Sequence, residues 1–206
     1  GIILGLRAHS VTNLGGNISG AGVIPSLSAL QMAPQVYRIP TVFFTGQAVF
    51  TNTAPMGPYR GAGRPEATYF MERMIEHAAL ATGIDRVELR RRNFIPASAM
   101  PFTTATGVVY DSGDFADTMN KTIARADWDG YDARKRASEQ RGKLRGRGLI
   151  YYVETCGIFN DRMELRFDPS GSVTIVAGTF SHGQGHATTF AQMASKWLGV
   201  PFESIR

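Results

Sequence analysis

The sequence predicts an α+β fold in which mixed sheets pack against helices. Apolar runs near the start of the chain are short and separated by Gly, Asn, Ser and Pro, which is typical of strands joined by loops. Two longer stretches, residues 65–82 and 186–198, carry apolar side chains at helical spacing. The chain changes character near residue 96, where we place a boundary between residues 1–96 and residues 97–206.

In the first part, the apolar run of residues 1–6 reads as a strand. Residues 42–44 and 48–50 read as two further strands, split by Thr45-Gly46-Gln47. We therefore expect strands and loops over the first fifty residues.

The helix over residues 65–82 has clear end signals. Pro65 suits a first helical turn, Glu66 complements the positive end of the helix dipole, and Gly83 is a natural stop. Its expected buried face consists of Met71, Met74, Ile75 and Ala78. A short helix is expected next, from Asp85 to Arg92.

In the second part, a helix over residues 115–126 is expected, with Asp111 or Asp114 as its cap. Residues 128–148 are polar and basic and read as a surface linker. Strands return at residues 149–154 and 163–167, and the turn signal Asp168-Pro169-Ser170-Gly171 joins the latter to residues 172–180 as a hairpin. The closing helix presents Phe190, Met193, Ala194, Trp197 and Leu198 on one face.

Bulk composition excludes several classes of protein. The chain has 206 residues, 43% hydrophobic residues and a formal net charge of +5, which is ordinary for a globular protein and favours anionic ligands. No apolar run approaches the roughly 20 residues of a membrane span. The lone Cys156 excludes an internal disulfide framework and a thiolate metal cluster, and we interpret it as a buried, unreactive thiol. The chain starts without Met in a strand-like run, so we expect a piece of a longer protein.

Two stretches share one architecture, a glycine-rich loop that leads into an amphipathic helix. They are residues 58–66 and residues 181–186. A helix start offers unpaired N–H groups and partial positive charge, and glycine lets a ligand approach the backbone. The pair predicts a large polyanionic ligand, and for the second loop the alternative is a tight turn whose glycines serve geometry alone.

In the first loop, Arg60 and Arg64 flank Gly61-Ala62-Gly63. Arginine's planar fork suits phosphate, carboxylate or an oxo group. The alternative is that both arginines are solvated, or that one pairs with Glu66 or Glu72. The loop is neither a Walker A motif nor a full Gly-x-Gly-x-x-Gly fingerprint.

In the second loop, Gln184 lies between Gly183 and Gly185, followed by His186 and Thr188 in the first helical turn. Their amide, imidazole and hydroxyl groups can bind an anion or a heterocycle. His182 and His186 have the i, i+4 spacing of a metal pair, but no glutamate stands between them as metalloprotease chemistry requires. We assign no metal ligands.

Two arginine-rich runs raise a different function. Arg90-Arg91-Arg92 and residues 141–147 could form a basic patch for nucleic acid. Aromatic residues are not interleaved with them, and acidic residues dilute the charge. We favour a solvated helix end and a surface linker.

Several motifs together resemble a known family. They are Thr51-Asn52-Thr53-Ala54-Pro55, residues 59–67, residues 88–96, residues 107–115, and Gly183-Gln184-Gly185-His186 with Thr188, Thr189 and Gln192. In register over nearly the whole chain, they resemble the large, molybdopterin-binding subunit of molybdenum hydroxylases. That family includes xanthine dehydrogenases, aldehyde oxidoreductases and aerobic-type carbon monoxide dehydrogenases.

The resemblance implies molybdenum bound by molybdopterin in its cytosine dinucleotide form, and oxidative hydroxylation of a small-molecule substrate with water. It implies iron–sulfur clusters and FAD on partner subunits or domains. By this resemblance Gly183, Gln184, Gly185, His186 and Thr188 hold the cofactor. Arg60, as the catalytic residue, and the Gly61-Ala62-Gly63 loop lie beside the molybdenum.

Two departures from the family pattern refine the expectation. Gly61 stands where carbon monoxide dehydrogenases carry the cysteine that bridges to copper, so an aldehyde, a purine or an N-heterocycle is the expected substrate class. The family's upstream Gly-Gly-x-Phe-Gly motif and the glutamate of its Gly-Val-Gly-Glu segment have no counterpart here, so no general base is named.

We therefore expect an internal fragment that joins the end of one molybdopterin-binding domain to the start of a second. The isolated fragment is expected to be inactive, and the rest of the large subunit is among its expected partners. Nucleic acid is not. The expected location is cytoplasmic, with a periplasmic location through a partner subunit as the alternative. The competing hypotheses are a non-catalytic nucleotide- or RNA-binding module and a degenerate relative without cofactor.

Overall fold

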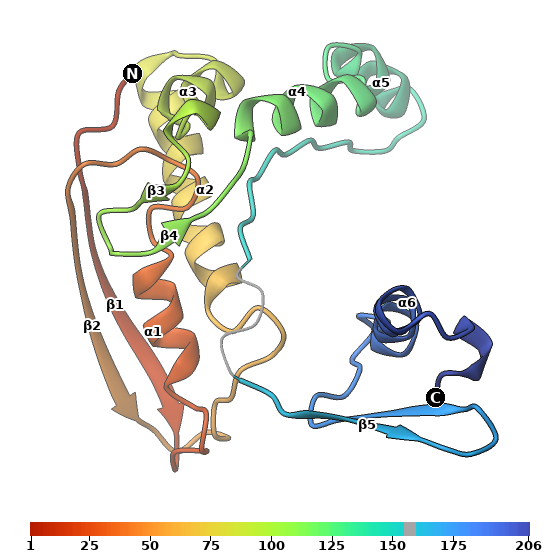
Figure 1. Ribbon diagram of the computed structural model, residues 1–206. Helices are drawn as coiled ribbons and strands as arrows, with labels where there is room; N and C mark the ends of the chain where they lie inside the picture. The colour runs from red at the N-terminus through yellow and green to blue at the C-terminus, as the bar shows by residue number, and fades with distance from the viewer. Residues whose placement is uncertain (155–159) are drawn as a thin grey trace. The chain divides into compact units, whose positions relative to one another are not determined.

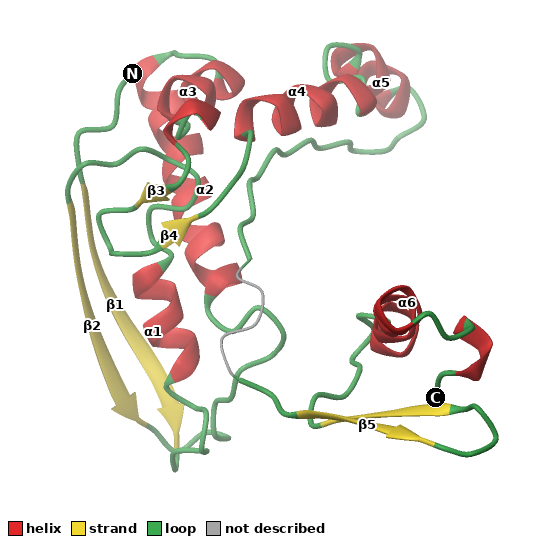
Figure 2. Ribbon diagram, in the orientation of Figure 1, coloured by secondary structure: helices red, strands yellow, loops and turns green. Residues whose placement is uncertain are grey.

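The computed structural model describes residues 1–154 and 160–206, and Cys156 lies outside them. The chain divides into two compact units, Gly1–Glu154 and Thr155–Arg206. Among the described residues, helices are combined with three two-stranded sheets, one parallel and two antiparallel, which confirms the α+β prediction (Figures 1 and 2).

A β–α–β unit opens the first compact unit. Strand β1 (Leu6–Gly15) pairs in parallel with β2 (Val42–Phe50), and helix α1 (Ile24–Gln31) makes the crossover. The expectation of strands and loops alone was wrong here, because parallel strands require a crossover and Pro25 starts a helix in it. The expected strand over residues 1–6 begins only at Leu6, and β2 runs unbroken through Thr45-Gly46-Gln47.

Two helices follow as the end signals predict. Helix α2 (Arg64–Thr82) stops at Gly83, which has a φ of 70°. Helix α3 (Arg86–Asn93) is capped by Asp85, whose carboxylate accepts from the backbone N–H groups of Val87 and Glu88 at 2.9 and 3.0 Å. Of the expected buried face of α2, Met71 and Ile75 are buried, whereas Met74 is 53% exposed. The core around α2 and α3 includes Val36, Tyr37, Leu89, Phe94 and Met119.

The rest of the first unit is partly as expected. A 3₁₀ turn (Ala97–Ala99) and the short antiparallel strands β3 (Phe102–Thr103) and β4 (Val109–Tyr110) precede α4 (Phe115–Arg125). Asp114 caps α4 by accepting from the N–H of Asp117 at 2.9 Å.

The basic stretch after α4 is more ordered than a surface linker. It contains helix α5 (Tyr131–Glu139), and the guanidinium of Arg147 lies over the rings of Trp128 and Tyr131, 4.4 and 4.3 Å from their centroids. The local sequence is polar, so only these long-range contacts reveal its order. The expected strand at residues 149–154 does not form, because no neighbouring strand among the described residues pairs with it.

The second unit matches its prediction closely. Strands β5 (Met163–Phe167) and β6 (Val173–Ala177) form the expected hairpin, with Gly171 at a φ of 86° in its turn. Helix α6 (His186–Leu198) stops at Gly199 and is followed by a 3₁₀ turn (Phe202–Ser204). Strand β6 ends three residues before the expected Phe180.

Candidate functional site

The first glycine loop turns with an unusual run of backbone angles. The φ values of Arg60, Gly61, Ala62 and Gly63 are 23°, 84°, 44° and 96°, all in the positive region. Arg60 and Ala62 have side chains, so each costs about 1–3 kcal/mol to hold there. Such a run persists only where surrounding contacts fix it.

The glycines of this loop have reasons within the chain. A Cβ on Gly63 would lie 1.9 Å from the carbonyl oxygen of Pro25, so the loop backbone packs directly on α1. A Cβ on Gly61 would lie 2.7 Å from the hydroxyl of Tyr152 and 2.9 Å from the ring of Pro65. Packing within the chain therefore accounts for both glycines, and their contact with a cofactor stays a prediction.

Arg64 differs from both interpretations that the sequence offered. Its side chain is only 11% exposed, and its Nε lies 2.8 Å from Glu154 Oε1, so its partner is neither Glu66 nor Glu72. Its Nη1 also donates to the carbonyl oxygen of Gly61 at 3.2 Å. Arg60, by contrast, is exposed. The loop thus carries one structural arginine and one that a ligand can reach.

The second glycine loop belongs to the second unit. Gly183 and Gly185 have φ values of 104° and 76°, and Gly185 begins α6 with no side-chain cap. Within the described structure nothing lies within 4 Å of where a Cβ on Gly185 would stand. Here the glycine is required by its φ and leaves open space over the backbone, as ligand approach to a helix start requires.

Side chains in this loop order its turn. Gln184 Oε1 accepts from the backbone N–H of His182, and Ser181 Oγ accepts from the N–H of Gly185 at 3.3 Å. Thr188 is exposed, and its backbone N–H donates to the carbonyl oxygen of Gly185 at 3.1 Å. The side-chain carbonyl of Gln184 is therefore used in a hydrogen bond within the loop itself.

The ring of His186 lines a pocket of about 350 Å³. It stacks on Phe190, with 4.8 Å between centroids and 20° between planes. Its Nδ1 is buried and has no hydrogen-bond partner among the described residues. The same pocket is lined by Thr179, Ser181 and Arg206. An orphaned ring nitrogen, the Ser181 hydroxyl, a guanidinium and a helix start fit the donor set that a phosphorylated, polyanionic group needs.

The histidine pair does not form a metal site. The ring of His182 lies 4.4 Å from that of Phe180, while that of His186 lies on Phe190. Across residues 1–154 and 160–206, no three His, Cys, Asp or Glu side chains gather as metal ligands. Every helix in these ranges is also too short or too polar to cross a bilayer.

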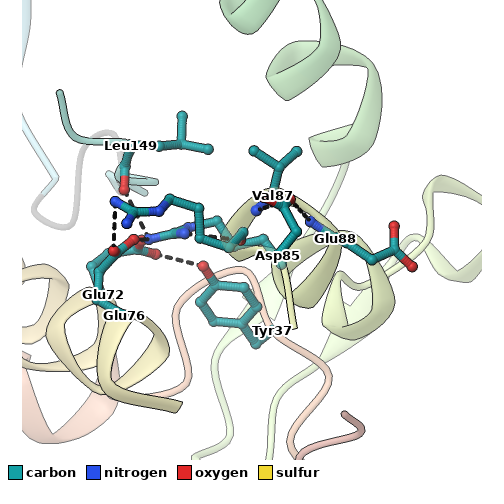
Figure 3. Close-up of polar contacts among 9 residues, drawn as sticks. Tyr37, Glu72, Glu76, Asp85, Val87, Glu88 and Leu149 are labelled. Carbon is teal, nitrogen blue, oxygen red and sulfur yellow. Dashed lines mark hydrogen bonds and ion pairs between the residues drawn. The ribbon is translucent and has the colours of Figure 1, made fainter. Parts of the chain in front are cut away.

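Arg90 lies in the core, so the interpretation of Arg90-Arg91-Arg92 as a solvated helix end was wrong for this residue. Its side chain is 0% exposed and contacts the carboxylates of Glu72 and Glu76 at 2.7 and 2.9 Å (Figure 3). Its Nη2 also donates to the carbonyl oxygen of Leu149 at 2.8 Å, and Tyr37 donates to Glu72 at 2.6 Å. The core can hold this charge because two carboxylates neutralise it.

The neighbouring arginines are exposed, as expected. Arg91 and Arg92 pair with Glu88 at 3.4 and 2.8 Å, and these pairs hold the pKa of Glu88 below its usual range. The run Arg90-Arg91-Arg92 thus exposes less positive charge than the sequence suggested, because Arg90 is internal and Arg91 and Arg92 are paired with Glu88.

Comparison with known proteins then decides the family. Residues 1–94 and 121–206 each match a family model described as a molybdopterin cofactor-binding domain. The large subunit of nicotine 6-hydroxylase from Paenarthrobacter nicotinovorans is 32% identical over 100% of this chain. The chain belongs to the molybdenum hydroxylase large-subunit family. The boundary that we expect at residue 96 falls between the two matched stretches and stays a prediction.

Other members of the family agree with this assignment. The large chain of carbon monoxide dehydrogenase from Hydrogenophaga pseudoflava is 34% identical over the whole chain. Quinoline 2-oxidoreductase from Pseudomonas putida 86 superposes with a TM-score of 0.79 at 28% identity, covering 95% of this chain. The chain spans only 27% to 28% of the length of those proteins.

Sequence reasoning missed two residues that support the first loop, Tyr152 and Glu154. They lie about ninety positions from Gly61 in a segment that reads as a strand, so no local pattern connects them to the loop. Burial and the adjacent Glu154 raise the pKa of Tyr152 to about 12, because both disfavour the charged phenolate.

Proposed function

We propose that this chain is part of the catalytic subunit of a molybdenum hydroxylase, and that its two glycine loops hold the cofactor. The observation that carries the proposal is that each of the two matched molybdopterin-binding stretches contains a glycine loop that leads into a helix, one at Gly63 and one at Gly185. When bound, molybdopterin with its molybdenum supplies the two-electron redox chemistry.

The chain's own groups would hold the cofactor and orient the substrate. Gly183, Gln184, Gly185, His186 and Thr188 would bind the pterin and its phosphates with backbone N–H groups and side-chain donors. Arg60, exposed at its turn, would direct its guanidinium toward the substrate or an oxo group. The Gly61-Ala62-Gly63 backbone would lie beside the metal.

The overall reaction is the oxidation of a C–H bond to C–OH by water. One water supplies the oxygen, and two protons and two electrons leave. We propose that the electrons pass to iron–sulfur and flavin groups on partner subunits, and that the cofactor is the cytosine dinucleotide form. We assign no general base among the described residues, and the electron-accepting groups are proposed to lie on other subunits.

An N-heterocycle is the proposed substrate class. Similar proteins bear names that specify nicotine, nicotinate, quinoline and xanthine. The glycine at position 61, where carbon monoxide dehydrogenases carry a copper-bridging cysteine, argues against carbon monoxide. Aldehydes are the second class to screen, because an aldehyde oxidoreductase from Desulfovibrio desulfuricans superposes with a TM-score of 0.79 at 25% identity.

The test is the cofactor content of the full-length subunit co-expressed with its partners. We expect near-stoichiometric molybdenum, and cytidine nucleotide released on denaturation. Arg60→Ala and Gln184→Ala are expected to lose cofactor or turnover, whereas residues 1–206 alone are expected to turn over no substrate. Absence of molybdenum under conditions that load a known relative would leave the degenerate scaffold or the nucleotide-binding module.

The RNA-binding hypothesis makes the opposite prediction. Binding would then fall steeply with salt and depend on Arg91, Arg92 and residues 141–147. Arg90 would not contribute contacts, because its side chain is internal.

A further inference from the structure

The segment of residues 149–154 has no strand pairing, yet side chains fix it at several points. The carbonyl oxygen of Leu149 accepts from Arg90 Nη2 at 2.8 Å. The hydroxyl of Tyr151 donates to the carbonyl oxygen of Phe115 at 2.8 Å. At its far end Glu154 pairs with Arg64. A segment held in this way has a defined position without a sheet.

The carboxylate of Glu154 joins two groups that touch the first glycine loop. Its Oε1 lies 2.8 Å from Arg64 Nε, and its Oε2 accepts from the hydroxyl of Tyr152 at 2.6 Å. Arg64 Nη1 donates in turn to the carbonyl oxygen of Gly61. The Tyr152 hydroxyl occupies the space where Gly61 would otherwise carry a Cβ. All three side chains therefore converge on Gly61.

The loop needs such support. Residues 60–63 all have positive φ, and two of them carry side chains, so the conformation survives only where contacts enforce it. Pro25 fixes the loop at Gly63. The Arg64–Glu154–Tyr152 group fixes it at Gly61, directly after Arg60. The Glu154 carboxylate forms an ion pair with the guanidinium and accepts a hydrogen bond from the Tyr152 hydroxyl, and a hydrogen bond to a charged acceptor is stronger than a neutral one.

We propose that Tyr152 and Glu154 are positioning residues: through Arg64 and Gly61 they hold the loop in the left-handed conformation that presents Arg60. The role of Arg60 in catalysis rests on the proposed function. The inference that these residues hold the loop does not, because it follows from contacts within this chain.

The experiment uses the full-length subunit with its partners and compares Glu154→Gln and Tyr152→Phe with wild type. Glu154→Gln keeps the shape and removes the charge that Arg64 needs, while Tyr152→Phe removes only the hydroxyl. Tyr69→Phe, at a tyrosine that is 71% exposed on α2, and Glu139→Gln, at an exposed glutamate on α5, are the matched controls.

The first readout is hydrogen exchange in the peptide that covers residues 58–64. Loss of one such link is expected to speed exchange there by about fivefold or more, with no change in the controls. The double variant should be little worse than the worse single variant, because both residues act on one loop. Glu154→Asp, which keeps the charge, should restore part of the protection.

The second readout is molybdenum content together with the Mo(V) electron paramagnetic resonance spectrum of the partly reduced enzyme. We expect an altered spectrum or lower content in both variants, at an unfolding midpoint close to that of the controls. Unchanged exchange in residues 58–64 would overturn the proposal. Faster exchange with a wild-type spectrum and content would overturn the positioning role. If wild type itself held no molybdenum, the proposed function would fail while exchange still decided whether the loop is held.

Discussion

The guanidinium of Arg90 and the carboxylate of Glu72 form an ion pair in the core, with Nη2 and Nε at 2.7 and 3.0 Å from Oε2. The exposed fractions of the two side chains are 0% and 3%. Glu76 and the carbonyl oxygen of Leu149 complete the shell around the guanidinium. This pair therefore ties α2, α3 and the start of residues 149–154 together in the first unit.

The first prediction concerns the removal of Arg90. Arg90→Ala leaves the Glu72 carboxylate buried without its cation, so the free energy of unfolding should fall by about 3–5 kcal/mol. Arg91→Ala is the matched control, since Arg91 is 42% exposed and its pair with Glu88 contributes at most about 1 kcal/mol. Chemical denaturation of the purified protein measures both. Equal losses in the two variants would contradict a central role for the buried pair.

The second prediction concerns alkaline pH. Burial, with the adjacent Glu72 carboxylate, raises the pKa of Tyr37 far above its ordinary value of 10.0. The folded state thus keeps a proton that the unfolded chain releases. This contribution to stability is complete below pH 10 and declines above it, by at most about 1.4 kcal/mol per pH unit.

Tyr37→Phe has no such proton, so the stability difference between wild type and Tyr37→Phe should narrow as the pH rises above 10. Denaturation curves at successive pH values measure the difference. Tyr69→Phe, which alters an exposed ring on α2, is measured alongside as the matched control. A constant gap for Tyr37→Phe would show that the hydroxyl titrates as in the unfolded chain.

The third prediction separates the two kinds of glycine in the loops. Gly185→Ala meets open space and should cost only the strain of a positive φ, about 1–2 kcal/mol. Gly63→Ala adds a Cβ 1.9 Å from the carbonyl oxygen of Pro25, so the loop or α1 must move and the loss should be larger. Hydrogen exchange in the first turn of α2 should rise for Gly63→Ala and stay at the wild-type rate for Gly185→Ala. Similar behaviour of the two variants would mean that the loop yields easily.

Local signals in the sequence predicted the elements that have them. Pro65, Glu66 and Gly83 bounded α2 to within one residue, and the turn at residues 168–171 located the β5–β6 hairpin. These succeed because caps and turns depend on residues adjacent in the chain.

The predictions that were wrong concern contacts between residues far apart in the sequence. A run of three arginines looks solvated until Glu72, 18 positions earlier, is seen to accept from Arg90 in the core. The parallel pairing of β1 with β2 joins His9 to Thr45, 36 positions apart. The crossover between these strands contains helix α1, whose short apolar run did not predict a helix. The support of Gly61 by Tyr152 is of the same kind. Such contacts are set by packing, which periodicity does not encode.

The fourth prediction concerns the segment that leads into the second glycine loop. Asp161 Oδ2 accepts from the backbone N–H and the hydroxyl of Thr179 at 2.9 and 2.7 Å. These bonds, the hydroxyl first, hold the pKa of Asp161 below its ordinary value of 3.8. Because the folded pKa is depressed, the stabilisation is present above pH 3.8 and is lost as the pH falls through the folded value.

Asp161→Asn should therefore speed hydrogen exchange at the Thr179 amide at neutral pH, since a neutral amide oxygen accepts more weakly than a carboxylate. Asp168→Asn is the control: Asp168 caps the hairpin turn by accepting from the N–H of Ser170 at 2.8 Å and does not contact Thr179. Thr179 lies four positions before Gly183, so the released amide would free the chain that enters the loop. If exchange at Thr179 were the same in both variants, Asp161 would not anchor this segment, and the order of the second loop would rest on its own contacts through Gln184 and Ser181.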